Sequence, residues 1–271
     1  MHPGEPGVQD VKDGQTDAGA CVSETKPKRI LLKLSGEAFC KPGIGGIDPA
    51  ELELIASEIA DARAKGAQIA VVVGGGNFVR GAELAERGDI VRATADYMGM
   101  LGTIINALAL KDKLESMGTP ARVCSALEIR SVAEPFIRGR AIRHLEKGRV
   151  VVLGAGTGNP FFTTDTCASL RATELGCSAL LKATKVDGIY TADPKKDPSA
   201  TRYESLTFDE ALEKRLGVLD TAAFAMCEEH NIPIVVFEFK KRGNIARVVA
   251  GENIGTTVQN ASDATPALRA E

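Results

Sequence analysis

The sequence predicts an α/β protein in which a central, mostly parallel sheet lies between two layers of helices. Apolar, strand-like runs alternate with amphipathic helical patterns along most of the 271-residue chain, which is typical of a sheet covered on both faces. The run at 68–73 is unbroken and rich in β-branched residues, as expected of a central strand. Glycine-rich loops follow several strands directly, at the edge where open α/β sheets bind their ligands.

The elements can be placed in order along the chain. Strands are expected at 29–34, 68–73, 121–124, 149–153, 179–182 and 233–237, with a short edge strand near 255–258. Helices are expected from Asp48 to Gly66, from near Asn77, at 91–117, from about Thr164, at 207–215 and at 220–230. Asp48 followed by Pro49 is a helix-starting pair, and Gly66 is a typical stop. Residues 185–206 are rich in Asp-Gly and Asp-Pro turns.

Composition and charge exclude several classes of protein. The chain is 44% hydrophobic and 25% charged, with a formal net charge of −3, which is typical of a soluble globular protein. The chain lacks the excess of Lys and Arg that would indicate binding to nucleic acid or to an anionic membrane surface. No apolar run reaches membrane-spanning length. Residues 28–258 are expected to form one domain, between a disordered leader (1–27, without a signal peptide) and a flexible tail (259–271).

The six cysteines favour a reduced protein rather than a metal site. They form no C-x-x-C pair and do not lie at zinc-binding spacing from the three histidines. Cysteines of this kind in a chain of this length are expected to be buried thiols of a cytoplasmic protein. No protein-ligated metal site is predicted.

The first strand-end loop is 33–37. Lys33 closes the strand, and Leu34, Ser35 and Gly36 form a turn whose backbone N–H groups could bind phosphate beside the lysine ammonium. The alternative is a plain turn with a solvated lysine. This loop alone does not decide between the two.

The second loop is 74–76, three glycines directly after the strand at 68–73. Glycines at such a place allow a ligand to approach the backbone. A helix starting near Asn77 would point its positive end at the same space, with Arg80 on its first turn able to bind phosphate through two hydrogen bonds. The alternative is a flexible linking turn.

The third loop is 154–165, which combines glycines, threonine hydroxyls and two phenylalanines before a helix start. Its hydroxyl and backbone groups could bind a base and a phosphate, although Phe161 and Phe162 could instead be core anchors. Neither a G-x-x-x-x-G-K-[ST] loop nor a G-x-G-x-x-G pattern is present. The absence of the second pattern argues against a nicotinamide-dependent dehydrogenase.

Together these loops resemble the bacterial UMP kinases, within the amino-acid-kinase fold. The matching blocks follow in the same order over about 28–258, and they are 30–37, 74–77 with Arg80 and Gly81, 96–101, 156–165 and 181–188. The block at 156–165, together with Asp96-x-Met-Gly-Met, is the most specific of them. The resemblance implies transfer of the γ-phosphoryl group of ATP to UMP in pyrimidine nucleotide biosynthesis, with Mg²⁺ bound to ATP.

The resemblance also implies a role for each matching residue. The implied ATP contacts are Lys33, Leu34, Ser35, Gly36, Gly76, Arg80, Thr184, Tyr190 and Asp193. The implied UMP contacts are Gly75, Asp96, Thr157, Gly158, Asn159, Pro160, Phe161, Phe162, Thr163 and Thr164. The implied catalytic residues are Lys33, Arg80, Lys182 and Asp220. Simpler roles stay open: Tyr190 could serve packing, Asp193 a turn, and Asp220 the capping of the next helix.

The family further implies a homohexamer and, in many members, GTP as activator and UTP as inhibitor. The residues that match the effector site are Lys41, Pro42, Gly43, Ile44, Gly45, Gly46, Arg122 and Arg149. Lys111 and Glu115 stand where some relatives carry more basic character. The apolar helix around 98–108 could supply a subunit contact or could simply pack in the core.

A phosphate acceptor needs little acid–base help, which fits the absence of histidine from the glycine loops. The second pKa of a phosphate monoester is about 6, so UMP would already be a dianionic nucleophile at neutral pH. Catalysis would then depend on alignment and on cations around the transferred group. The rival hypotheses are a kinase of this fold that acts on a carboxylate or carbamate, and a non-catalytic anion-binding protein.

Overall fold

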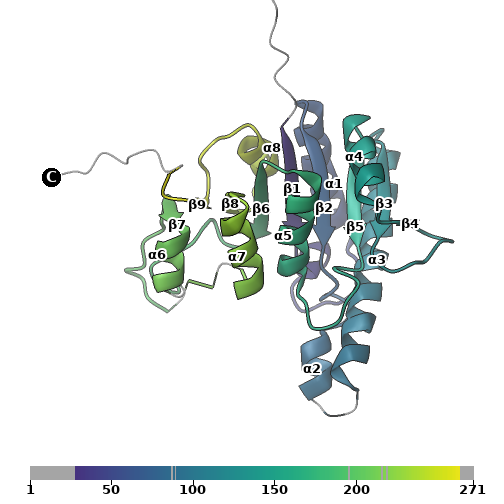
Figure 1. Ribbon diagram of the computed structural model, residues 1–271, viewed down its shortest axis with the longest axis horizontal. Coiled ribbons are helices and arrows are strands. Elements are labelled where there is room, and N and C mark those ends of the chain that lie inside the picture. The colour runs from purple at the N-terminus through teal and green to yellow at the C-terminus, as the bar shows by residue number, and fades with distance from the viewer. Residues whose placement is uncertain are drawn as a thin grey trace, which may run out of the picture.

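The computed structural model describes residues 28–262, apart from residues 87, 89, 195, 215 and 218. Within this part of the chain one nine-stranded sheet has helices on both faces, so the predicted three-layer αβα class is confirmed (Figure 1). The predicted leader (1–27), the tail from 263 onward, Cys21 and the end of the helix expected at 207–215 lie outside the described residues.

The strands lie in the order β4-β3-β5-β2-β1-β6-β8-β9-β7. Neighbouring strands are parallel except for β8 and β9, which are antiparallel. Their bounds are β1 Arg29–Leu34, β2 Gln68–Val73, β3 Ala121–Ser125, β4 Glu134–Pro135, β5 Val150–Gly154, β6 Ala179–Thr184, β7 Ser205–Thr207, β8 Ile234–Glu238 and β9 Thr256–Gln259.

The helices divide between the two faces of the sheet. Their bounds are α1 Pro49–Ala64, α2 Gly81–Glu86, α3 Arg92–Ser116, α4 Arg138–Glu146, α5 Thr164–Leu175, α6 Phe208–Glu213, α7 Thr221–Glu229 and α8 Asn244–Val249, with a 3₁₀ turn at Gly36–Phe39 after β1. Helices α1, α3 and α8 pack in one apolar core, and α4 to α7 pack in the other. Helix α2 and the start of α3 project beyond the sheet at the carboxyl ends of the strands (Figure 1).

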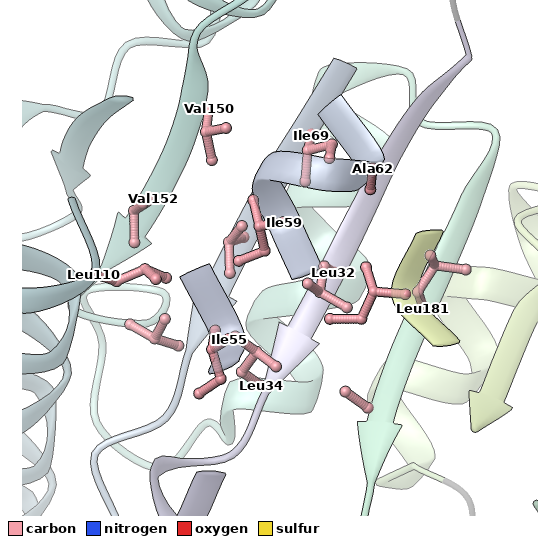
Figure 2. Packing of buried hydrophobic residues seen from close by; sticks show 14 of the residues in the cluster. Leu32, Leu34, Ile55, Ile59, Ala62, Ile69, Leu110, Val150, Val152 and Leu181 are labelled. Atoms are coloured by element: carbon pink, nitrogen blue, oxygen red, sulfur yellow. The ribbon is translucent and has the colours of Figure 1, made fainter. Parts of the chain in front are cut away.

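The central strands contribute to both cores because their side chains alternate between the two faces. In β1, Leu32 and Leu34 face the α1 side, where Figure 2 shows them beside Ile55 and Ile59, whereas Leu31 belongs to the opposite core. All five side chains are fully buried. Burial on both faces explains why these strands are apolar without interruption, and it fixes their carboxyl ends in one rigid row.

Helix caps fix where the loops end. Asp48 caps α1 by accepting hydrogen bonds from the backbone N–H groups of Ala50 (3.0 Å) and Glu51 (3.2 Å), as its sequence predicts. Thr163 caps α5 in the same way, and Gly176 ends that helix in the left-handed conformation that glycine allows. The loop before α5 is therefore held at a defined place above the strand ends.

Two expectations about elements are wrong, and one stretch contains elements that were not expected. No helix begins at Asn77: residues 76–78 form a turn, and α2 starts at Gly81, so Arg80 precedes the helix instead of lying on its first turn. Strand β9 is not an edge strand, because β7 pairs with its outer side in parallel. The stretch between β3 and β5, in which no element is expected, contains the short strand β4 and helix α4.

The described cysteines are free and buried, as predicted: Cys40, Cys124, Cys167, Cys177 and Cys227. Burial raises the pKa of Cys124 and Cys177 to about 12, and that of Cys167 and Cys227 to about 11, so these thiols stay protonated at neutral pH. Among the described residues, no helix combines the length and the apolar character needed to cross a membrane.

Candidate active site

The loops that follow β1, β2 and β5 meet at the carboxyl edge of the sheet, as predicted. With α2 and the start of α3 they enclose a cavity of about 590 Å³, here called the central cavity. The predicted site residues that line it are Ser35, Gly36, Gly75, Gly76, Arg80, Asp96, Thr157, Asn159, Phe162, Thr163 and Thr164. Gly158, Pro160 and Phe161 are not among its lining residues, and the side chain of Leu34 lies in the core.

The glycines of these loops serve close packing of backbone against backbone. A Cβ added to Gly36 would lie 2.5 Å from the backbone nitrogen of Gly76, and one added to Gly74 would lie 2.6 Å from that of Gly36. A Cβ on Gly75 would collide with the carbonyl oxygen of Gly99 in α3. At Gly76 the nearest atom is 3.9 Å away. Of the three glycines at 74–76, Gly76 alone leaves open space for a ligand, which corrects the expectation that all three do.

Two buried amides hold the loop after β2 in place. Asn77 Nδ2 donates to Asn106 Oδ1 (3.0 Å) and to the carbonyl oxygen of Gly46 (2.7 Å). Asn106 Nδ2 donates to Asn77 Oδ1 (2.7 Å) and to the carbonyl oxygen of Gly74 (2.8 Å). Asn106 is fully buried in α3, so this network ties the loop after β2 and the loop before α1 to one long helix.

Two lysines on neighbouring strands share one buried carboxylate. Lys33 in β1 and Lys182 in β6 are Cα partners in register, so their side chains leave the sheet side by side. Asp165, in the first turn of α5, forms ion pairs with both: Lys33 Nζ lies 2.6 Å from Oδ1, and Lys182 Nζ donates a hydrogen bond to Oδ2 at 2.8 Å. None of the three side chains is more than 17% exposed. We call this group the buried charge triad.

Burial and charge together shift the pKa values of Asp165 and Lys182 in the triad. Burial disfavours the charged form of Asp165, but the two ammonium groups outweigh it and hold the pKa of Asp165 below its ordinary value. Burial lowers the pKa of Lys182, Lys33 lowers it further, and Asp165 opposes both effects. With both lysines protonated and Asp165 ionised, the triad carries one net positive charge at a fixed position.

Asp220 links α7 to the loop before α5. Its Oδ1 accepts the backbone N–H of Ala223 at 2.9 Å, so the simpler role of helix capping is real. Its Oδ2 also accepts hydrogen bonds from the hydroxyls of Thr166 (2.8 Å) and Thr163. The carboxylate thereby fixes the end of the loop that lines the central cavity.

The Asp96 carboxylate is oriented from two sides. Arg92 Nε lies 2.9 Å from Oδ1 and 3.0 Å from Oδ2, and the backbone N–H of Phe161 donates to Oδ2 at 2.8 Å. Phe161 has a φ of 72°, an uncommon conformation for a residue with a side chain, and this contact accompanies it. Asp96 therefore lies in the cavity wall as an acceptor with a fixed direction, and it also holds the loop after β5.

A second carboxylate lies between two cations at the mouth of the cavity. Glu37 pairs with Arg80 through Oε1 and with Lys185 Nζ through Oε2 at 2.6 Å. Hydrogen bonding from Lys185 and the charges of Lys185 and Arg80 hold the pKa of Glu37 below its ordinary value. Arg80 also contacts Glu83 at 3.1 Å. We call Glu37, Arg80 and Lys185 the Glu37 clasp; its side chains are 39–50% exposed.

The residues predicted for the adenosine side gather in a separate cavity of about 470 Å³, the outer cavity. Thr184, Tyr190 and Asp193 all line it, together with Lys182 of the triad. Tyr190 donates its hydroxyl to Asp187 at 2.7 Å, and this bond raises the pKa of Tyr190. The triad thus lies between the outer cavity, which Lys182 lines, and the central cavity, which Thr164 lines next to Asp165.

The predicted effector residues lie in two separate places within the chain. Residues 41–45 line a cavity of about 240 Å³ that all three residues of the Glu37 clasp also line; Gly46 is not among its lining residues. Arg122, near the amino end of β3, pairs with Glu115 (2.9 Å), and Arg149, before β5, lies 3.0 Å from His144. Residues 41–45 therefore lie at the carboxyl ends of the strands, and the two arginines lie toward the other end.

Sequence reasoning missed four charged residues of this site: Glu37, Asp165, Arg92 and Lys185. Asp165 stands in the matching block at 156–165, but it becomes a candidate only once β1 and β6 are known to be neighbours. Arg92 stands four residues before Asp96 on α3, a spacing that places two side chains on one face of a helix. Lys185 comes directly after β6, the strand that contains the predicted residue Lys182. Nothing in the sequence pairs Lys185 with Glu37.

Comparisons with known proteins agree with this geometry. A model of the amino acid kinase family matches residues 28–238. The chain is similar to the crystal structure of UMP kinase from Bacillus anthracis, with 40% identity, a TM-score of 0.84, and coverage of 88% of this chain and 98% of that one. It is also similar to UMP kinase from Ureaplasma parvum, with 37% identity, a TM-score of 0.82, and coverage of 86% and 99%.

Proposed function

The chain belongs to the amino acid kinase family, and we propose that it is a UMP kinase, which transfers the γ-phosphoryl group of ATP to UMP. The observation that carries phosphoryl transfer is the buried charge triad, which fixes two ammonium groups between two cavities. The choice of UMP is supported by the similarity to two UMP kinases, each covered almost completely. In this proposal UMP occupies the central cavity and the adenosine of ATP occupies the outer cavity.

Phosphoryl transfer from ATP to UMP requires stabilisation of negative charge more than it requires proton transfer. The phosphate of UMP, with a second pKa of about 6, is mostly dianionic at neutral pH and needs no general base. Lys33 and Lys182 would donate hydrogen bonds to the oxygens of the transferred group as negative charge shifts toward ADP. Asp165 would keep the two ammonium groups apart and aimed in advance, so that little reorganisation is needed during the reaction.

The ribose of UMP is the natural partner of Asp96. Oδ2 of this carboxylate already accepts hydrogen bonds from Arg92 and Phe161, whereas Oδ1 accepts one from Arg92 alone and keeps an acceptor site for a ribose hydroxyl. Arg92 would act as a positioning residue in this arrangement. Phe162 and the threonines of the loop after β5, which line the same cavity, would surround the base and the phosphate.

The carboxylates near the triad fit a magnesium ion that arrives with ATP. Among the described residues no group of three His, Cys, Asp or Glu could hold a metal ion, and Mg²⁺ is commonly held by one or two carboxylates together with substrate phosphates and water. Asp165 forms ion pairs with both lysines, whereas Asp220 accepts hydrogen bonds from two threonine hydroxyls and one backbone N–H and lies in the field of Lys182. We propose Asp220 as the carboxylate that would hold the ion. When bound, the ion would neutralise charge on the ATP phosphates.

We further propose that the protein forms a homohexamer in the cytoplasm and supplies UDP for UTP and CTP synthesis. An apolar stripe on α3 supports self-association: Tyr97, Leu101 and Ile105, four residues apart on one helix face, are 42%, 48% and 47% exposed. Activation by GTP and inhibition by UTP stay predictions. Because residues 41–46 lie apart from Arg122 and Arg149, an effector that contacts both groups would have to bridge two subunits.

A coupled ADP-release assay tests the proposed function. The purified protein is given ATP and Mg²⁺ with UMP, CMP, acetylglutamate, glutamate or carbamate as acceptor. We expect rapid ADP release with UMP, much slower release with CMP, and background rates with the other three. A protein that binds ATP but releases ADP no faster with UMP than without an acceptor would contradict the proposal.

A further inference from the structure

Lys185 lies between the two cavities of the proposed active site. The residues on either side of it, Thr184 and Val186, line the outer cavity. Its ammonium group reaches in the other direction, to Glu37 Oε2 at 2.6 Å, and Glu37 lines the central cavity. Lys185, Glu37 and Arg80 also line together the cavity of about 240 Å³ beside residues 41–45. Lys185 is therefore connected to the outer cavity through its chain neighbours and to the central cavity through its ion pair with Glu37.

The Glu37 clasp has the charge pattern of an anion site that an internal carboxylate already fills. Glu37, from the turn after β1, accepts Arg80 from the loop after β2 and Lys185 from the end of β6. Glu37 is ionised at neutral pH, because its two cationic partners lower its pKa. One carboxylate thus holds two cations that follow different strands, and cations of these two kinds also bind phosphate groups.

This arrangement can exchange its anion at small cost. The side chains of Lys185, Arg80 and Glu37 are 47%, 50% and 39% exposed. An ion pair between side chains this exposed contributes little to stability, because water and salt screen it. A triphosphate carries more charge and more acceptor oxygens than one carboxylate, so it would displace Glu37 from both cations.

We propose that Lys185 binds a phosphate group of ATP, and that Glu37 holds Lys185 and Arg80 in position until the triphosphate replaces its carboxylate. This inference rests on the proposed function, since it takes ATP as the nucleotide of the outer cavity. It adds one cation to the predicted ATP contacts. It also gives Glu37 a definite role as a competitor of the phosphate.

The test measures nucleotide affinity by titration calorimetry, with ATP and UMP titrated separately in excess Mg²⁺. Lys185→Met removes the charge and keeps the length of the side chain. We expect it to weaken ATP binding about tenfold, since hydrogen bonds to charged groups are among the stronger ones, and to leave UMP binding within about twofold. Lys147→Met, an exposed lysine after α4 near the opposite ends of the strands, controls for net charge and should change neither affinity.

Glu37→Gln tests the competition directly. Without the carboxylate charge, the two cations are available at once, so we expect ATP to bind about threefold more tightly and to bind less tightly again in Glu37→Gln/Lys185→Met. Thermal unfolding of each variant confirms the fold. Unchanged ATP affinity in Lys185→Met, beside a wild-type protein that binds ATP, overturns the inference and leaves the proposed function standing. A wild-type protein that binds neither nucleotide overturns both.

Discussion

The molecule contains two sites in which one carboxylate lies between two cations, and they differ chiefly in burial. In the buried charge triad, both lysines stand on adjacent strands and no side chain is more than 17% exposed. In the Glu37 clasp, the cations come from loops and all three side chains are 39–50% exposed. The buried arrangement keeps fixed charges for the transition state, whereas the exposed one can release its cations to a ligand. The same residue types are thus expected to act in phosphoryl transfer in the buried charge triad and in nucleotide binding in the Glu37 clasp.

The largest difference between the two sites is expected when the charge of Asp165 is removed. In Asp165→Asn two buried ammonium groups would face each other without a counter-charge, and losing one partner of a buried ion pair costs about 3–5 kcal/mol. We expect the free energy of unfolding in urea to fall by about that amount. A loss below about 1 kcal/mol would mean that the triad is not a buried charge system in solution.

The next largest effect is expected on turnover when Lys33 is removed. Loss of one preorganised donor to the transition state lowers kcat by about 10²–10³-fold, and we expect Lys33→Ala to do so while the circular dichroism spectrum stays that of the wild type. The measurement is kcat at saturating ATP and UMP. Near-normal turnover in the folded variant would remove Lys33 from the mechanism.

The triad also predicts how activity depends on alkaline pH. Burial and the neighbouring Lys33 lower the pKa of Lys182, so its ammonium loses its proton at a lower pH than an exposed lysine, whose pKa is about 10.4. We therefore expect kcat to decline below that pH. Thermal unfolding over the same range shows whether the protein stays folded. A kcat that is flat up to the ordinary lysine pKa would contradict the assignment.

Stability should respond to acid in the direction set by Asp165. Its folded pKa lies below its unfolded value of about 3.9, so the stabilisation is fully present above that value and is lost as pH falls through the folded pKa. We expect the free energy of unfolding of the wild type to decrease below about pH 4 more steeply than that of Asp165→Asn. Parallel curves for the two proteins would contradict this linkage.

The smallest effect is expected for the exposed site. Glu37→Gln removes a solvent-exposed ion-pair partner, and such pairs contribute about 0–1 kcal/mol. We expect its free energy of unfolding to lie within about 1 kcal/mol of the wild type, and the difference to shrink further in 0.5 M salt (roughly 4 Å screening). A loss as large as that of Asp165→Asn would remove the distinction between the two sites.

The strands and most of the helices could be predicted because their signals are local. Gln68–Val73 reads as a central strand from its own residues, and Asp48 with Pro49 marks the start of α1 without help from the rest of the chain. Strand β7 and helix α4 could not be predicted in this way. The first is three residues long and is defined by its pairing with β9, and the second has charged residues over much of its surface.

The site was predictable as a set of loops but not as a set of contacts. Lys33 and Lys182 were both candidates, yet their shared carboxylate on Asp165 depends on β1 and β6 being neighbours, which the order of strands along the chain does not reveal. Likewise, Gly74 and Gly75 are explained by the approach of other backbone segments. Strand order and close packing are properties of the whole fold. The sequence pattern alone therefore does not reveal the contacts of Asp165, Gly74 and Gly75.

The most direct test of this account is a side-by-side measurement of kcat and of the KM for ATP in Lys182→Met and Lys185→Met, with UMP saturating. We predict that Lys182→Met loses most of its kcat at any ATP concentration. Lys185→Met should instead recover near-normal kcat once ATP is raised above an increased KM. Equal losses of kcat in the two variants, or a wild-type protein that forms no ADP with UMP, would contradict the account.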